Sequence, residues 1–200
     1  MTAEAKVSDQ LEGWLRSDGE RTLGSLIELF GEKSFAIVFV LLLAVPALPL
    51  PTGGATHVFE AIAMLLALEL IVGRRTIWLP KRLCRRDLSG LARGRFGTAL
   101  LKRFRWFERF ARPRGGRLLR QRLAGVVFGL IVLALSVTAF VAPPFSGLDT
   151  LPALGVVVLA LGVLFEDALL ALAGTAMGAL GVVVVVGLGS LVTRWVKDLL

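Results

Sequence analysis

The sequence predicts an all-α integral membrane protein. It would have two repeated, Pro/Gly-broken helical hairpins, each preceded by an amphipathic interfacial helix, plus a C-terminal transmembrane helix. The chain is 56% hydrophobic with a mean hydropathy of +0.76, more apolar than the roughly one half typical of soluble domains. Its apolar residues gather in five blocks, 35–50, 55–72, 123–142, 148–165 and 168–193. These lengths approach or reach the roughly 20 residues of a membrane-spanning helix, and a backbone in lipid satisfies its own hydrogen bonds as a helix.

Residues 1–33 are the predicted N-terminal amphipathic segment, on the cytoplasmic side. Within residues 22–31 the apolar side chains recur at three- and four-residue steps on one helical face, and Gly31 stands where such a helix would end. Charges recur through the first 34 residues, without a short apolar run followed by small residues. We therefore expect no signal peptide.

Residues 34–73 predict the first membrane hairpin. Its first arm, residues 35–50, has 16 residues, which is about 24 Å of helix at 1.5 Å per residue. A hydrocarbon core is about 30 Å thick, so this arm is short for a full crossing. Both a re-entrant hairpin that turns inside the membrane and a spanning hairpin therefore stay open.

The two arms are separated by the sequence PLPTGGATHVFE, residues 49–60. Pro49 and Pro51 lack a backbone donor, and the two glycines after them can adopt positive φ angles, so a helix break is predicted here. Broken helices of this kind indicate binding sites in secondary transporters. Thr56 is expected to cap the helix that follows, whose free N–H groups and positive dipole end attract anions.

Polar side chains at the break are the candidates for a substrate- or ion-binding site. His57 and Glu60 lie three residues apart on one helical face. A carboxylate inside a membrane is costly, which suggests a proton relay, an ion ligand or a substrate contact. If the break lies at the outer surface instead, these side chains are solvated residues at a helix start. The candidates are Thr52, Gly53, Gly54, Thr56, His57 and Glu60.

Glu69 is an additional candidate, although its position close to Arg74 and Arg75 favours an interfacial pairing with arginine. We expect no metal site and no cofactor, because the chain has one histidine and its one cysteine, Cys84, lies far from it.

Residues 74–122 are predicted to be a basic cytoplasmic segment. It holds seventeen Lys or Arg residues against two acidic ones, and such an excess beside membrane spans marks the cytoplasmic side. Four phenylalanines and Leu100 recur at three- and four-residue steps between positions 96 and 110, with basic residues at the other positions, which predicts an amphipathic helix lying in the interface. Anionic lipid is therefore the expected partner, rather than nucleic acid. The expected lipid-binding residues are Arg95, Lys102, Arg103, Arg105 and Arg109.

Residues 123–167 predict a second hairpin that repeats the first. A shift of 93 residues places Pro51 on Pro144 and Gly54 on Gly147, and matches Leu-Ala-Leu triplets beyond them. If both hairpins enter from the cytoplasm, residues 168–200 form a last transmembrane helix that carries the C-terminus outward. Glu166-Asp167 at its start is interpreted as helix capping.

Two glycine pairs spaced four residues apart, Gly125 with Gly129 and Gly174 with Gly178, predict close helix packing. The packing would lie either within the monomer or between the subunits of a homodimer.

Residues 22–81 resemble the ExoD family of bacterial inner-membrane proteins associated with exopolysaccharide synthesis. The resemblance rests on the ordered set Gly31-Glu32, Pro46, Pro49, Pro51, Gly53, Thr56, Gly73-Arg74 and Trp78-Leu79-Pro80. Glu69 departs from it, because glutamine is expected there. The resemblance implies a place in exopolysaccharide production at the bacterial inner membrane and proteins of that machinery as partners, but it supplies no catalytic residues.

A catalytic role is not expected. The chain has no Asp-x-Asp motif and no soluble domain large enough for a nucleotide sugar, which excludes a glycosyltransferase. An intramembrane hydrolase would depend on Thr52 or Thr56 with His57 and Glu60, a generic spacing. The leading hypothesis is a multi-pass, non-catalytic protein whose broken helices bind or transport an ion, proton, lipid or lipid-linked sugar. The alternative is an accessory, scaffold or regulatory protein acting through its basic helix.

Overall fold

The computed structural model describes residues 6–17, 21–48, 55–78, 81–85, 87–88, 95–119, 121–143 and 146–199. Its elements are helices, which confirms the predicted all-α class for these residues. They are α1 (Val7–Arg16), α2 (Leu23–Phe30), η1 (Gly31–Lys33), α3 (Ser34–Leu43), α4 (Ala55–Ile71), α5 (Lys81–Cys84), α7 (Arg95–Phe110), α8 (Gly116–Leu119), α9 (Arg122–Val141), α10 (Thr150–Leu164) and α11 (Ala168–Leu199).

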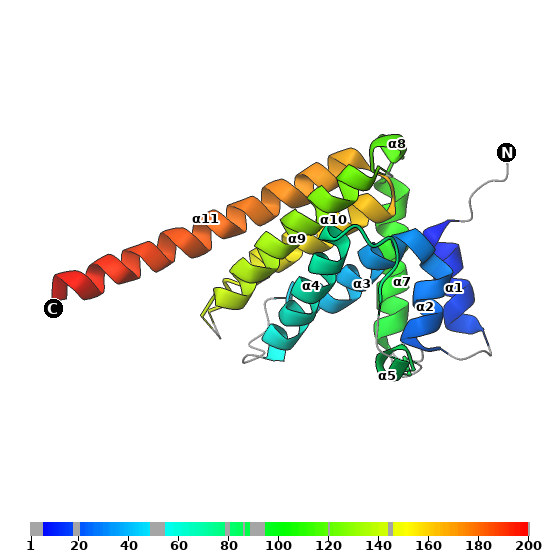
Figure 1. Cartoon of the computed structure of the whole chain (residues 1–200), viewed down its shortest axis with the longest axis horizontal. Helices are drawn as coiled ribbons and strands as arrows, with labels where there is room; N and C mark the ends of the chain where they lie inside the picture. The colour runs from blue at the N-terminus through cyan, green and yellow to red at the C-terminus, as the bar shows by residue number, and fades with distance from the viewer. Residues whose placement is uncertain are drawn as a thin grey trace.

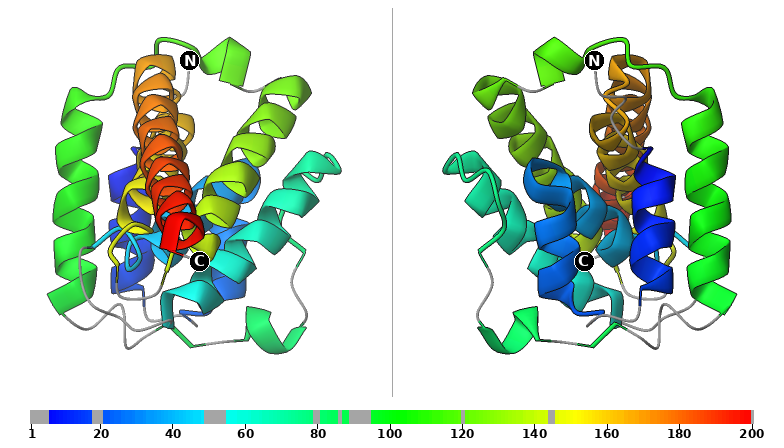
Figure 2. Two further views of the ribbon diagram at one scale, coloured as in Figure 1. Left: turned by 90° about the vertical axis from the view of Figure 1, so that its left-hand side faces the viewer. Right: turned by 90° about the vertical axis from the view of Figure 1, so that its right-hand side faces the viewer.

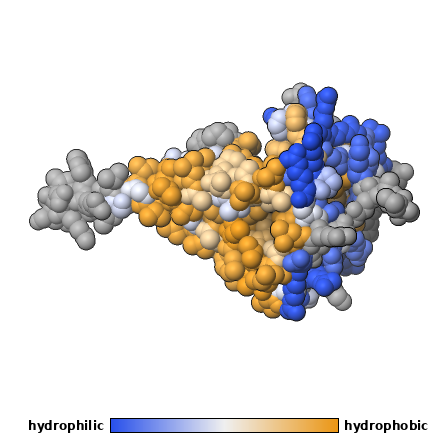
Figure 3. All heavy atoms as spheres, turned by 90° about the horizontal axis from the view of Figure 1, so that it is seen from above, coloured by the Kyte–Doolittle hydropathy of each residue, from blue (hydrophilic) through white to orange (hydrophobic). Residues whose placement is uncertain are grey.

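The helices form an apolar body and a polar base. In the body α10 packs mainly on α11 and α3, while α4 packs mainly on α9, and these helices run in roughly one direction (Figure 1). The base contains α1, α2, α5 and α7 at one end of the body (Figure 1), and Figure 2 shows α11 nearly end-on. Hydrophobic residues cover the body and hydrophilic residues gather at the base (Figure 3).

Two helices of the described chain are long and apolar enough to cross a membrane, namely α9 and residues 168–188 of α11. The other three predicted blocks are helical but shorter, with 10 residues in α3, 17 in α4 and 15 in α10. The prediction for the first arm was too long, since α3 ends at Leu43 and residues 44–48 form turns. Pro46 explains the end, because proline cannot donate the hydrogen bond that would continue the helix.

The base helix α2 confirms the helix predicted within residues 22–31. The Thr22 side chain accepts the backbone N–H of Ser25, and the Ser25 side chain accepts the backbone N–H of Thr22, so the N-terminus carries a reciprocal cap. At the other end Gly31 has a φ of 49°, a left-handed conformation that glycine adopts without steric cost. Both boundaries are therefore set by local sequence.

The contact between α10 and α11 depends on glycine. A Cβ atom on Gly174 would lie 2.2 Å from the backbone nitrogen of Leu159, and one on Gly155 would lie 2.4 Å from the Cα atom of Gly178. Real Cβ atoms do not approach so closely, so the two backbones touch where side chains are absent. The predicted glycine face of Gly174 and Gly178 thus packs within the monomer.

A second close approach joins α9 to α4, where a Cβ on Gly129 would lie 3.0 Å from the carbonyl oxygen of Ala67. Both glycine pairs therefore contribute to contacts inside the chain.

Asp167 joins the body to the base at the turn between α10 and α11. Its Oδ1 accepts the N–H groups of Leu169 at 3.0 Å and Leu170 at 3.3 Å, and its Oδ2 accepts the N–H of Arg112 at 2.9 Å. Burial alone would raise the pKa of this carboxyl, but the three N–H groups and the charge of Arg114 hold the pKa below its usual value. The predicted capping role of Asp167 is confirmed.

Replacing Asp167 by asparagine should lower the free energy of unfolding by about 1–2 kcal/mol at neutral pH, because an amide cannot accept N–H groups at both ends. A folded pKa below the unfolded value of about 3.9 means that the ionised group stabilises fully above that value and loses its effect as pH falls through the folded pKa. Thermal unfolding in detergent should therefore show a constant gap between native and variant from pH 7 to pH 5 that narrows below pH 4. A gap independent of pH would contradict this role.

Candidate functional site

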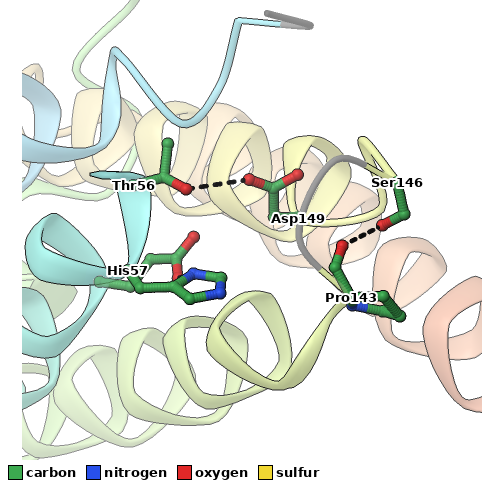
Figure 4. A network of polar contacts seen from close by, with 6 residues as sticks. Thr56, His57, Pro143, Ser146 and Asp149 are labelled. Carbon is green, nitrogen blue, oxygen red and sulfur yellow. Dashed lines mark hydrogen bonds and ion pairs between the residues drawn. The ribbon is translucent and has the colours of Figure 1, made fainter. Parts of the chain in front are cut away.

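The first turns of α4 and α10 meet at the end of the body away from the base (Figure 1). Thr56 of α4 donates a long hydrogen bond of 3.5 Å from Oγ1 to Oδ2 of Asp149, the residue before α10 (Figure 4). The prediction that Thr56 caps α4 was wrong, because the helix already begins at Ala55. Instead the buried Thr56 side chain links the two hairpins.

Glu60 lies one turn further along α4 and is completely buried. Its Oε2 is 2.9 Å from Nδ1 of His57, which confirms that these two residues share a helical face. The His57 ring also packs against Phe140 of α9, with ring centroids 5.2 Å apart. Since the His57 side chain is 27% exposed and Glu60 is 0% exposed, histidine separates the carboxylate from the surface.

The second oxygen of Glu60 is the unusual feature of the site. Among the described residues, Oε1 is buried and has no hydrogen-bond partner. A second acidic side chain lies at the same end of α4, because Thr56, one turn before Glu60, bonds the carboxyl group of Asp149. His57 can compensate an ionised carboxylate at Oε2 only, whereas a proton or a cation at Oε1 would satisfy the second oxygen.

Sequence reasoning missed Asp149 and Phe140. The 93-residue shift that aligned the two breaks also places Thr56 on Asp149, so the same alignment carried the signal for Asp149. No sequence pattern pointed to Phe140, because one phenylalanine in an apolar helix has no distinguishing spacing.

Residues 146–149, the described part of the second break, form a turn. Ser146 Oγ donates to the carbonyl oxygen of Pro143 at 2.6 Å (Figure 4), and Gly147 has a φ of 68° that suits glycine. This turn leads directly into Asp149. In the first break, the candidates Thr52, Gly53 and Gly54 lie outside the described residues.

Glu69 is not part of this site. It lies nine residues beyond Glu60 on α4, about 14 Å along the helix axis, and its Oε2 accepts the backbone N–H of Trp78 at 2.9 Å. The expected pairing with an arginine side chain is replaced by this main-chain contact. Arg74 instead lies over the Trp78 ring at 5.8 Å.

The predicted lipid-binding residues occupy α7 in the base. Lys102, Arg103 and Arg109 are exposed, while Arg105 forms an ion pair with Glu12 of α1. Of Arg95 only the backbone is described, as the first residue of α7. Within the described ranges, no group of three or more His, Cys, Asp or Glu side chains is arranged to hold a metal ion.

Comparison with known proteins gives a match over most of the chain. Residues 7–187 match the protein family described as Exopolysaccharide synthesis, ExoD. The chain is 30% identical over 178 residues to the uncharacterized protein slr1875 of Synechocystis sp., covering 85% of this chain and 81% of that protein. It is 29% identical over 178 residues to Protein ExoD of Rhizobium meliloti, covering 86% of this chain and 72% of that protein. No solved structure matches the chain.

Proposed function

Because this chain belongs to the ExoD family, which is described as an exopolysaccharide synthesis family, we propose that it acts in that process. Its role is to bind a proton or small cation at Glu60, inside the membrane. One observation carries the proposal. Glu60 is fully buried with Oε1 unpaired among the described residues, one helical turn from Thr56, which bonds the carboxyl group of Asp149. Intramembrane carboxylates are expensive and commonly form ion or proton pathways.

The packing of α10 on α11 supports a position within the bilayer. Gly155 lies against Gly178, and Gly181 lies against Pro152, so the two helices are antiparallel and Asp149 is level with about residue 184. That level is about 24 Å from the start of α11 at 1.5 Å per residue. It falls inside the apolar stretch 168–188, and the short arms α3 and α10 fit re-entrant hairpins that turn below the far surface.

The helix pairing also supports the internal repeat. The first arm of each hairpin packs on the second arm of the other, α3 on α10 and α9 on α4. This exchange is what two equivalent units around a common axis would give, and Thr56 at the start of α4 bonds Asp149 before α10. Only the first unit has the carboxylate, since Ala153 stands at the position that the repeat aligns with Glu60.

Complementation of a strain that lacks its own protein tests the proposal. Glu60→Gln keeps the size of the side chain and removes its charge, so secreted polysaccharide should fall at least about tenfold at unchanged membrane levels of the protein. Glu69→Gln is the matched control, because it makes the same change on the same helix at a site bound to main chain. It should keep normal output.

Normal polysaccharide output from Glu60→Gln would overturn the proposal. A second candidate function, an accessory role through α7, is favoured by the exposure of Lys102, Arg103 and Arg109. The accessory role would replace the proposal if reversing the charges at Lys102 and Arg103 abolished polysaccharide output while Glu60→Gln did not.

A further inference from the structure

Helix α7 runs across the direction of α11 and not along it (Figure 1). With α9 and residues 168–188 of α11 crossing a bilayer, α7 lies in the plane of the membrane at the polar end. One of its faces must therefore meet either the headgroups or the aqueous side.

Two faces of α7 are covered by the protein itself. Phe104 is buried and packs edge-on against Phe165 at the end of α10, with ring centroids 6.2 Å apart. Arg105 pairs with Glu12, and the Ser8 hydroxyl donates to Glu108, so the side between them faces α1. At about 100° per residue, the side of α7 that remains points away from both Phe104 and Arg105.

The remaining side of α7 combines aromatic and basic residues. At about 100° per residue its members fall within an arc of about 120°. Trp106 is 53% exposed and Phe110 is 65% exposed, and their ring centroids lie 4.9 Å apart. In the part of the chain that the structure describes, the ion pairs do not include Lys102, Arg103 or Arg109. We call this set the α7 outer face: Lys102, Arg103, Trp106, Arg109 and Phe110.

We propose that the α7 outer face binds acidic phospholipids of the leaflet on the basic side of the membrane. Tryptophan and phenylalanine rings insert at headgroup level, where one edge is apolar and the other is wet. Lysine and arginine bury their stems beside the rings and place their charges at the phosphates. Free phosphate offers no apolar part for the rings, so the combination of the two residue types points to a lipid.

Fluorescence quenching of the full chain in neutral detergent tests this proposal. The probe is phosphatidylglycerol with brominated acyl chains, titrated in mixed micelles, because bromine quenches only tryptophans that touch the acyl region. The Trp106→Phe variant should lose a defined part of the quenching seen with the native chain. The other tryptophans, Trp14, Trp78 and Trp195, supply the signal that remains.

Charge dependence is tested by changing Lys102, Arg103 and Arg109 together to glutamine. The affinity for brominated phosphatidylglycerol should fall about tenfold or more, since each basic residue at an anionic surface contributes several-fold. A matched triple variant changes Lys6, Arg82 and Arg85, which are also exposed and basic, and should stay within about twofold of the native chain. Brominated phosphatidylcholine should quench the native chain and both triple variants alike.

Equal loss of affinity in the two triple variants would overturn the proposal, as would full quenching in Trp106→Phe. Tighter binding of a single-stranded RNA oligonucleotide than of phosphatidylglycerol would also overturn it, as would displacement of the lipid by millimolar inorganic phosphate. Because all the changed side chains are exposed, circular dichroism should show unchanged helix content. The test does not involve Glu60, so it is independent of the function proposed for that residue.

Discussion

Replacing Gly174 by leucine is expected to remove most folded protein from the membrane. A Cβ at this position would lie 2.2 Å from the nitrogen and 2.7 Å from the Cα atom of Leu159. These are backbone atoms of α10, so no side-chain rotation can make room. The helices would have to separate along the interface that unites the second hairpin with α11.

The free energy of unfolding should fall by at least about 3 kcal/mol, at or above the upper end of ordinary overpacking. The reason is that backbone atoms, and not a side chain, obstruct the new atoms. Gly187→Leu is the control on the same helix, since an added Cβ there meets nothing within 4 Å. Thermal unfolding in detergent and membrane levels by blot measure both variants. Equal midpoints for the two variants would show that α10 and α11 do not pack through these glycines.

Replacing Glu60 by leucine is expected to raise the stability of the protein and abolish polysaccharide output. The native side chain is buried with an oxygen that has no partner among the described residues. Leaving a polar group of this kind buried and unpaired costs about 1–3 kcal/mol, so its removal should stabilise the fold by up to that amount, less the lost bond to His57. The thermal midpoint in detergent should therefore rise. Complementation should fail, as is also expected for Glu60→Gln.

Glu69→Leu is the control for this effect, because Glu69 bonds the backbone of Trp78 and lies at the exposed end of α4. Its midpoint should stay the same or fall slightly. A lower midpoint for Glu60→Leu than for Glu69→Leu would mean that the carboxylate holds the hairpins together. The expected opposition between stability and activity is typical of residues kept for function.

Several features followed from local sequence alone. The apolar blocks predicted helices, and the steps of three and four residues placed α2 and α7 correctly, because such periodicity reflects which side of one helix is buried. His57 and Glu60 were expected to share a face for the same reason, and the 2.9 Å contact agrees. Capping by Asp167 could also be predicted, since a carboxylate just before a helix can accept the free N–H groups of its first turn.

Other features depend on residues far apart in the chain. Thr56 and Asp149 are 93 residues apart, and only the folded arrangement of the two hairpins shows that the threonine bonds Asp149 and does not cap its own helix. Arg105 was expected at the lipid surface but pairs with Glu12, because α1 folds back along α7. The sequence left open whether the glycine face of α11 packs within the monomer or against a second subunit. The structure shows that it packs on α10.

The difference between the features that local sequence predicts and those that only the fold decides has one physical cause. Solvation and hydrogen bonding within a helix act over a few residues, so composition and periodicity reveal the membrane class, the helices and the polar break. Contacts between helices depend on which surfaces meet, and many pairings are compatible with the same local pattern. The buried carboxylate was therefore a sequence candidate, while its unpaired oxygen and the bond between Thr56 and Asp149 emerged only when the helices packed.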